Sequence, residues 1–204
     1  MSDRVMVGIS DREEELTVAV ACDARHEAGH LAIAAANGLR LRADALALDR
    51  GAQGIAFYFK QPDGKEPYPE RVCLALYAGY FAERRFRDAH AYPYMSADRF
   101  FRGSVDASEL NLLLPRIPAE RLTNGNATAT GMRLRADSEL LVERHWPAIE
   151  ELAAALLTKR WEPLKLLKSG EIWSREAAAL YLPGSEAVEI LARHGIAASW
   201  GAGS

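Results

Sequence analysis

The sequence predicts a mainly α-helical protein of the α+β class with a small β-sheet. Residues 14–37 are dominated by alanine and leucine, which favour helix. Residues 132–168 have the apolar spacing of amphipathic helices, and residues 40–59 contain two short segments typical of strands. The chain has 204 residues, of which 49% are hydrophobic, so it is long enough for one domain with a sizeable core.

The first helix is expected from Glu14 to Asn37. The polar residues 1–13 that precede it are expected to form a flexible arm. Gly38 follows the helix directly, at the position where a glycine in the left-handed conformation commonly ends a helix.

A pair of strands is expected next, at residues 40–49 and 54–59. The first segment alternates in part and would place one set of residues on the same side of the sheet, namely Leu41, Ala43, Ala45 and Ala47. The second segment, "GIAFYF", is rich in aromatic residues. Glycines in the intervening "RGAQG" predict a turn that joins the two strands.

Helical spacing returns at residues 68–87. The small residues Ala78 and Gly79 in this stretch predict close packing against another helix. A short helix is then expected at residues 104–114, because Pro115 would stop it.

The C-terminal part is expected to be helical. A turn-rich connector at residues 123–131 leads into one or two helices within 132–168, with Pro147 marking a new start or a kink. Residues 176–204 are expected to form a helical tail that contains a short helix at 186–193.

Charge and cysteine content exclude several classes of protein. The net charge of -3 and the pI near 6.0 argue against a nucleic-acid partner, which a basic surface would bind. Cys22 and Cys73 are the only two cysteines and form no CxxC pattern, so a cysteine zinc site or a disulfide framework is not expected. No signal-peptide layout and no membrane span are recognised, and we expect a soluble, cytoplasmic protein.

The segment "RHEAGHLA" contains candidate metal-binding and catalytic residues. In a helix, His26 and His30 share one face, with about 5–6 Å between their β-carbons, so both imidazoles can bind one Zn²⁺ ion. Glu27 lies beside them and can accept a proton from water bound to the metal. This is the HExxH arrangement of zinc metallopeptidases, with Glu27 as the catalytic base.

The third zinc ligand is less apparent. An extended motif with a third histidine is excluded, because Ile33 and Ala36 stand at its positions. The other histidines (His90, His145 and His194) match no pattern. A carboxylate later in the chain is therefore expected, since two histidines and one carboxylate leave the fourth position for water.

Several segments in order resemble the FtsH-type metallopeptidases, the protease half of membrane-bound AAA proteases. After "HEAGH", these are "DRGAQGIAFYFKQP" (49–62), "LALYAGYFAERRF" (74–86), "LLVERHWPAIEELAAALLTKR" (140–160) and "SGEI" (169–172). The resemblance covers roughly residues 14–175 and implies a zincin-like helical domain over that range.

The resemblance also implies a third ligand. In that family an aspartate at the start of a later helix binds zinc, and the matching stretch here is "RGSVDASEL" (102–110), which nominates Asp106. A shifted alignment nominates Glu109, and Glu83 is a third candidate by analogy with zincins that use a glutamate.

The chain departs from this family in lacking an ATPase module, since no GxxxxGK[ST] phosphate loop is present. We therefore expect zinc-dependent hydrolysis of flexible or unfolded polypeptides, without a motor of its own. A separate ATPase partner or a homo-oligomer is left open. The alternative is a non-catalytic zinc-binding interaction or regulatory module derived from such a peptidase.

Overall fold

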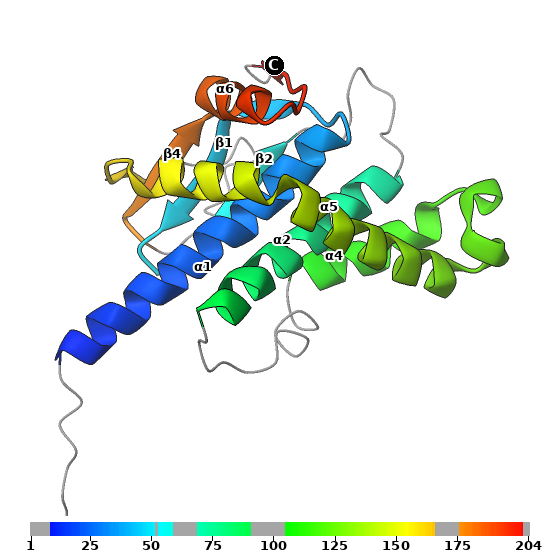
Figure 1. The fold of residues 1–204 in the computed structure, drawn as a ribbon, viewed down its shortest axis with the longest axis horizontal. Helices are drawn as coiled ribbons and strands as arrows, with labels where there is room; N and C mark the ends of the chain where they lie inside the picture. Colours follow the sequence, from blue (N-terminus) through cyan, green and yellow to red (C-terminus); the bar gives the residue numbers. More distant parts are fainter. Residues whose placement is uncertain (1–8, 52, 59–68, 91–104, 166–175, 202–204) are drawn as a thin grey trace, which may run out of the picture.

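The computed structural model describes residues 9–51, 53–58, 69–90, 105–165 and 176–201. Within these ranges, long helices pack against one face of a small sheet (Figure 1). This confirms the predicted mainly α (α+β) class. None of the helices in these ranges is long and apolar enough to cross a membrane.

Three helices form the helical layer: α1 (Ile9–Ala36), α2 (Pro69–Ala89) and α5 (Ala127–Leu157). Each of them packs against the other two. The C-terminal half of α1 is the most deeply buried part of the layer. Helix α1 begins at Ile9 rather than Glu14, so part of the expected N-terminal arm is helical.

Helix α1 ends as the sequence predicts. Gly38 has a φ of +77° and its N–H donates to the carbonyl of Ala35 at 2.9 Å, while Leu39 N–H donates to Ala34 at 2.9 Å. These two bonds form a Schellman motif, which uses the left-handed freedom of glycine to satisfy the last carbonyls of the helix.

Small residues allow α1 and α2 to approach each other closely. A β-carbon built on Gly29 would lie 2.7 Å from the Ala82 β-carbon and 2.8 Å from the Ala78 carbonyl oxygen. Any larger residue at position 29 would push the helices apart. The close packing predicted from Ala78 and Gly79 is confirmed.

An arginine fixes how α1 is rotated against its neighbours. Arg25 donates to both carboxylate oxygens of Glu150 on α5, at 3.0 Å each. Its guanidinium also lies 3.9 Å from the centre of the Phe86 ring on α2. Charge-assisted pairs with two parallel hydrogen bonds are directional, so this contact orients the turn that carries His26.

Helix α5 corrects two expectations. It starts at Ala127, inside the expected connector, because the Asn126 side chain caps it by accepting a bond from Ala129 N–H at 3.1 Å. It also runs through Pro147 as a single helix and ends at Leu157, short of the expected residue 168. The short helix α4 (Val105–Leu113) stops before Pro115 as expected, and three short 3₁₀ turns lead from it to α5.

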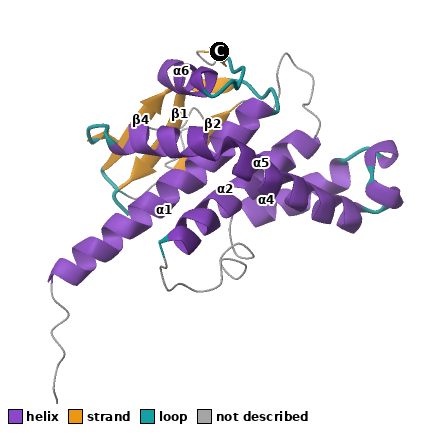
Figure 2. Cartoon of the chain, in the orientation of Figure 1, coloured by secondary structure: helices purple, strands orange, loops and turns teal. Residues whose placement is uncertain are grey.

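The sheet has the strand order β2-β1-β4-β3, with β5 paired to β1. Figure 2 shows β1 between β2 and β4. Its strands are β1 (Leu41–Asp49), β2 (Gly54–Tyr58), β3 (Glu162–Pro163), β4 (Ala178–Pro183) and β5 (Trp200–Gly201). The pairing of β1 with β2 is antiparallel and confirms the expected strand pair. Strand β2 lies at one edge of the sheet.

The prediction of which β1 side chains share one side of the sheet is wrong. The register shifts between Leu41 and Leu46, which is where a bulge reverses the alternation. As a result Ala43 is exposed, whereas Ala47 is buried on the sheet face opposite the helices, in a cluster with Tyr181.

The C-terminal segment is more than a helical tail. Helix α6 (Gly184–Arg193) matches the expected short helix, but β4 was not anticipated from the sequence. Strand β4 lies between β1 and β3, and its Leu180 and Leu182 belong to the main core. The sheet that carries the first strands is therefore completed by residues from within 176–204.

Candidate metal centre

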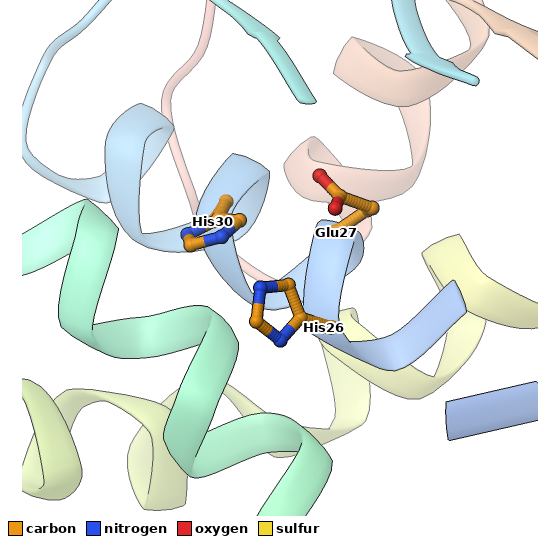
Figure 3. A group of neighbouring side chains, drawn as sticks. All are labelled: His26, Glu27 and His30. Carbon is orange, nitrogen blue, oxygen red and sulfur yellow. The ribbon is translucent and has the colours of Figure 1, made fainter. Parts of the chain in front are cut away.

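The residues of the HExxH motif lie on the buried part of α1. His26 and His30 are one turn apart, and both rings lie between α1 and α2, with Glu27 projecting on the other side (Figure 3). The ring centres of the histidines are 4.6 Å apart and the ring planes are nearly perpendicular, at 84°. One ligand atom from each of the three residues can be chosen so that all lie within 4.8 Å of one another.

Asp106, at the start of α4, reaches both histidines. Its Oδ2 lies 3.2 Å from His26 Nε2 and 3.3 Å from His30 Nε2. In a tetrahedral site with metal–ligand bonds of about 2.0 Å, neighbouring ligand atoms are about 3.3 Å apart. Both distances from the carboxylate to the imidazoles thus match the spacing of ligands around one Zn²⁺ ion.

The other ring nitrogen of each histidine contacts an acceptor on α2. His26 Nδ1 lies 3.0 Å from Glu83 Oε2, and His30 Nδ1 lies 2.7 Å from the carbonyl oxygen of Ala75. A neutral imidazole that donates from Nδ1 presents its lone pair at Nε2. These contacts are the outer hydrogen bonds that usually orient metal-binding histidines.

Glycines leave room for these side chains. A β-carbon on Gly79 would lie 2.5 Å from His30 Nε2 and 2.8 Å from His26 Nε2. A β-carbon on Gly54, at the start of β2, would lie 2.3 Å from Glu27 Cγ. The absence of a side chain at Gly79 therefore leaves space for the two imidazoles, and its absence at Gly54 allows β2 to lie close to Glu27.

The histidines and the carboxylates of the cluster shift one another's pKa values in opposite directions. Burial disfavours the charged imidazoles, but Asp106 and Glu83 outweigh burial and raise the pKa of His26 well above its ordinary value, and Asp106 raises that of His30. Conversely, both histidines keep the pKa of Asp106 well below its usual range despite burial. A bound cation would replace these protons.

Its surroundings make the Glu27 carboxylate more basic than an exposed one, because its pKa is raised. Burial raises the pKa of its carboxyl group, and the charges of His30 and His26 oppose this effect. A hydrogen bond from the backbone of Ala56 also favours the ionised form. A carboxylate with a raised pKa accepts a proton from water more readily than an ordinary one.

The three carboxylates considered for the third ligand occupy different places. Asp106 lies against both Nε2 atoms, and Glu83 lies on the Nδ1 side of His26, where it also pairs with Arg87. The charge of Glu109 acts on Tyr58 and on Cys73.

The remaining histidines are bound elsewhere or lie apart from the cluster. His90 Nδ1 contacts the Phe86 carbonyl oxygen at 2.8 Å, and His194 Nε2 contacts Glu151 at 2.6 Å. The charged neighbour of His145 is Arg144, and together with burial it lowers the pKa of that histidine.

Two residues near the centre were missed by sequence reasoning. Asp23 lies one turn before His26, and burial raises its pKa to about 8, against the opposing charge of His26. Its position three and four residues before His26 and Glu27, on the same helical face, was the available signal. Tyr58, in β2, interacts electrostatically with Asp106 and Glu27, and the sequence alone offered no signal for it.

Comparison of the chain with protein families, with curated proteins and with solved structures returned no match. Function is therefore inferred from the geometry of the site.

Proposed function

We propose that this chain is a zinc-dependent metallopeptidase that hydrolyses peptide bonds in flexible or unfolded polypeptides. The observation that carries the proposal is the placement of Asp106 Oδ2 at 3.2 and 3.3 Å from the two histidine Nε2 atoms, with Glu27 beside them. Two imidazoles and one carboxylate form a donor set of catalytic zinc sites, in which the fourth position is left for water or substrate.

His26, His30 and Asp106 would hold the metal. When bound, zinc lowers the pKa of water and polarises a carbonyl group. Glu83 and the Ala75 carbonyl hold the two imidazoles in the orientation that presents Nε2. Their role is to keep the ligand atoms in place before the cation arrives.

Glu27 would transfer a proton from the attacking water to the leaving amine. Its carboxylate accepts a proton from the attacking water and delivers it to the amine nitrogen that leaves when the peptide bond breaks. The surrounding burial favours the first step, because a carboxyl group with a raised pKa takes the proton more readily than an exposed one.

An extended substrate fits beside the motif. Strand β2 is at the edge of the sheet and passes over Glu27 at Gly54. Among the described strands, β1 alone pairs with it, so the outer backbone groups of β2 can bind a polypeptide as an added strand. Only a chain that is already flexible can adopt that conformation without being unfolded by a motor.

The variant Glu27→Gln tests this function. We expect it to retain one zinc ion per chain and to lose cleavage of casein by about 10²-fold or more, because a general base contributes about 10²- to 10⁴-fold. Zinc content is measured by mass spectrometry of the native protein, and cleavage by release of labelled peptides. Glu109→Gln is the matched control and should cleave as the wild type does.

The same experiment distinguishes the peptidase from the alternative, a zinc-binding module without peptidase activity. If Glu27→Gln cleaves casein as fast as the wild type, Glu27 is not the base. If the wild type binds zinc and cleaves no disordered substrate, the chain is a zinc-binding module without peptidase activity.

A further inference from the structure

Helix α5 carries an apolar stripe on its exposed face. Met132, Ala136 and Leu140 stand four residues apart, so they share one face of the helix, and all three are exposed. Met132 is 72% exposed and Leu140 is 69% exposed, whereas Leu134 and Val142 of the same helix are buried in the core. The stripe therefore lies on the side of α5 that faces away from the core.

The stripe is symmetric about Ala136. Met132 lies four residues before it and Leu140 four residues after it. A two-fold axis beside Ala136 would place Met132 of one copy of the chain against Leu140 of a second copy, and the reverse contact follows by symmetry. The small side chain of Ala136 at the centre allows the two helices to approach closely. Each copy would thus cover the large apolar side chains that the other exposes.

Charged residues beside the stripe favour an antiparallel pairing. On one side Arg133 precedes Asp137, and on the other side Arg135 precedes Glu139, with four residues between the members of each pair. In an antiparallel pair of helices, the same side of both copies meets with its order reversed, so each arginine lies next to an acid of the second copy. In a parallel pair, opposite sides meet in the same order, and arginine lies next to arginine.

The flanking side chains contact groups of their own chain and still reach solvent. Arg133 lies 3.1 Å from the Asp137 carboxylate, and Glu139 lies 3.4 Å from Arg84. These side chains are half-buried, so they can approach a second copy without leaving their present partners. Exposed ion pairs add little affinity, and their main effect is on the orientation of the partner.

We propose that the chain forms a two-fold symmetric dimer in which α5 packs antiparallel against α5 of a second copy, with Met132, Ala136 and Leu140 at the contact. Helix α5 begins at Ala127, nine residues before Ala136, so the overlap extends to residue 145, nine residues after it. A contact of this size fits a weak dimer with a dissociation constant of about 1–100 µM. The stripe contains none of the residues of the candidate metal centre, so this inference is independent of the proposed peptidase function.

Sedimentation equilibrium of the full chain at about 1–200 µM tests the dimer. We expect the average mass to rise with concentration from 22.4 kDa towards twice that value. Met132→Lys and Leu140→Glu should each weaken association by at least about tenfold, because each substitution puts an unpaired charge into both apolar contacts. Both positions are exposed, so the melting temperature at low concentration should not change.

An equimolar mixture of these two variants tests the direction of the pairing. In an antiparallel mixed dimer, the introduced lysine faces the introduced glutamate, and the other contact keeps Met132 against Leu140. Association of the mixture should therefore return to within about threefold of the wild type. In a parallel dimer the two substituted positions do not meet, and the mixture should associate no better than either variant alone.

Leu112→Glu is the matched control, because Leu112 is 66% exposed on α4, outside the stripe. This variant should associate as the wild type does. A wild-type chain that keeps a mass of 22.4 kDa up to about 200 µM would refute the dimer. Equal loss of association in Leu112→Glu and Leu140→Glu would refute the stripe as the contact, and a mixture of Met132→Lys with Leu140→Glu that stays monomeric would refute the antiparallel arrangement.

Discussion

At the scale of single residues, the proposed metal site depends on Asp106. Two imidazoles on one turn of helix are a partial ligand set, and the carboxylate that we propose as the third ligand lies 80 positions after His26 and 3.2 Å from its Nε2. Glu109 is one turn farther along α4. The two carboxylates therefore allow a direct comparison between the proposed ligand position and a neighbouring position.

Asp106→Asn should weaken zinc binding by more than about 10²-fold. Loss of an outer hydrogen-bond partner typically costs about 10- to 100-fold in metal affinity, and loss of a ligand costs more. Competition with a chromophoric chelator measures the affinity. Glu109→Gln should bind zinc within about threefold of the wild type, and a reversed order of the two variants would assign the third ligand to Glu109.

The raised pKa of Asp23 makes folding less favourable near neutral pH than at acidic pH. Its pKa is about 8 in the folded chain, against an ordinary value of 3.8, chiefly because burial disfavours the charged form. Between these two values the folded chain binds more protons than the unfolded chain. The stability of the metal-free protein therefore falls as the pH rises from about 4 to about 8.

Asp23→Asn should remove this dependence. We expect the metal-free variant to be more stable than the wild type by about 1–3 kcal/mol at pH 8 and to differ little at pH 4. This is less than the shift multiplied by about 1.36 kcal/mol per pKa unit, because Asp23 is only partly buried and solvent screens its charge. Urea unfolding at the two pH values, with a chelator present, measures the difference. An equal effect of the substitution at both pH values would show that the charge of Asp23 is not responsible.

At the scale of elements, the approach of α2 to α1 shapes the site. Glycine on each helix removes the side chain that would separate them: Gly29 faces Ala82, and Gly79 lies beneath His26 and His30. The same close approach brings Glu83 and the Ala75 carbonyl to the Nδ1 atoms. Helix packing and imidazole orientation are thus one structural feature.

Gly79→Ala tests this coupling. The new β-carbon would lie 2.5 Å from His30 Nε2, so the imidazole or the helix has to move. We expect a loss of about 1–3 kcal/mol in stability, as for other overpacked cores, and a fall of about tenfold or more in zinc affinity. Gly51→Ala is the control, because its β-carbon would meet its nearest neighbour at 3.4 Å. Unchanged zinc affinity in Gly79→Ala would show that the packing of α1 against α2 does not determine the geometry of the site.

Element boundaries were predicted well where the signal is local. Gly38 ends α1 and Pro115 follows α4, because backbone conformation at these residues depends on the residue itself. Pro147 was overestimated as a breaker. It lies within α5, where packing against α1 and α2 maintains one continuous helix.

At the scale of the whole molecule, the C-terminal segment completes the core. Strand β4 pairs with β1 along most of its length, and α6 packs against β1. Leu182 and Leu191 are fully buried. Each buried leucine contributes about 1.5–3 kcal/mol, and a domain of this kind is stable by only about 5–15 kcal/mol.

A chain that ends at residue 175 should therefore not fold cooperatively. It lacks β4, α6 and β5, which leaves β1 without a partner on one side. Thermal unfolding followed by circular dichroism should show no sharp transition, whereas a chain that lacks only residues 202–204 should melt as the wild type does. A sharp transition in the shorter chain would mean that residues 14–175 form an independent domain.

The sequence by itself determined what depends on neighbours along the chain. The spacing of His26 and His30 places both on one helical face, and the ends of α1 and α4 follow from the single residues Gly38 and Pro115. Strand β4 escaped prediction because a short apolar run such as "AALYLP" fits a strand or a buried helix equally well.

Only the tertiary structure decided which distant groups meet the histidines. Asp106 comes from α4 and Glu83 from α2, and their positions relative to α1 depend on how those helices pack. The rise of a helix fixes distances over a few residues, whereas distances across the core depend on the volume of every side chain between the elements.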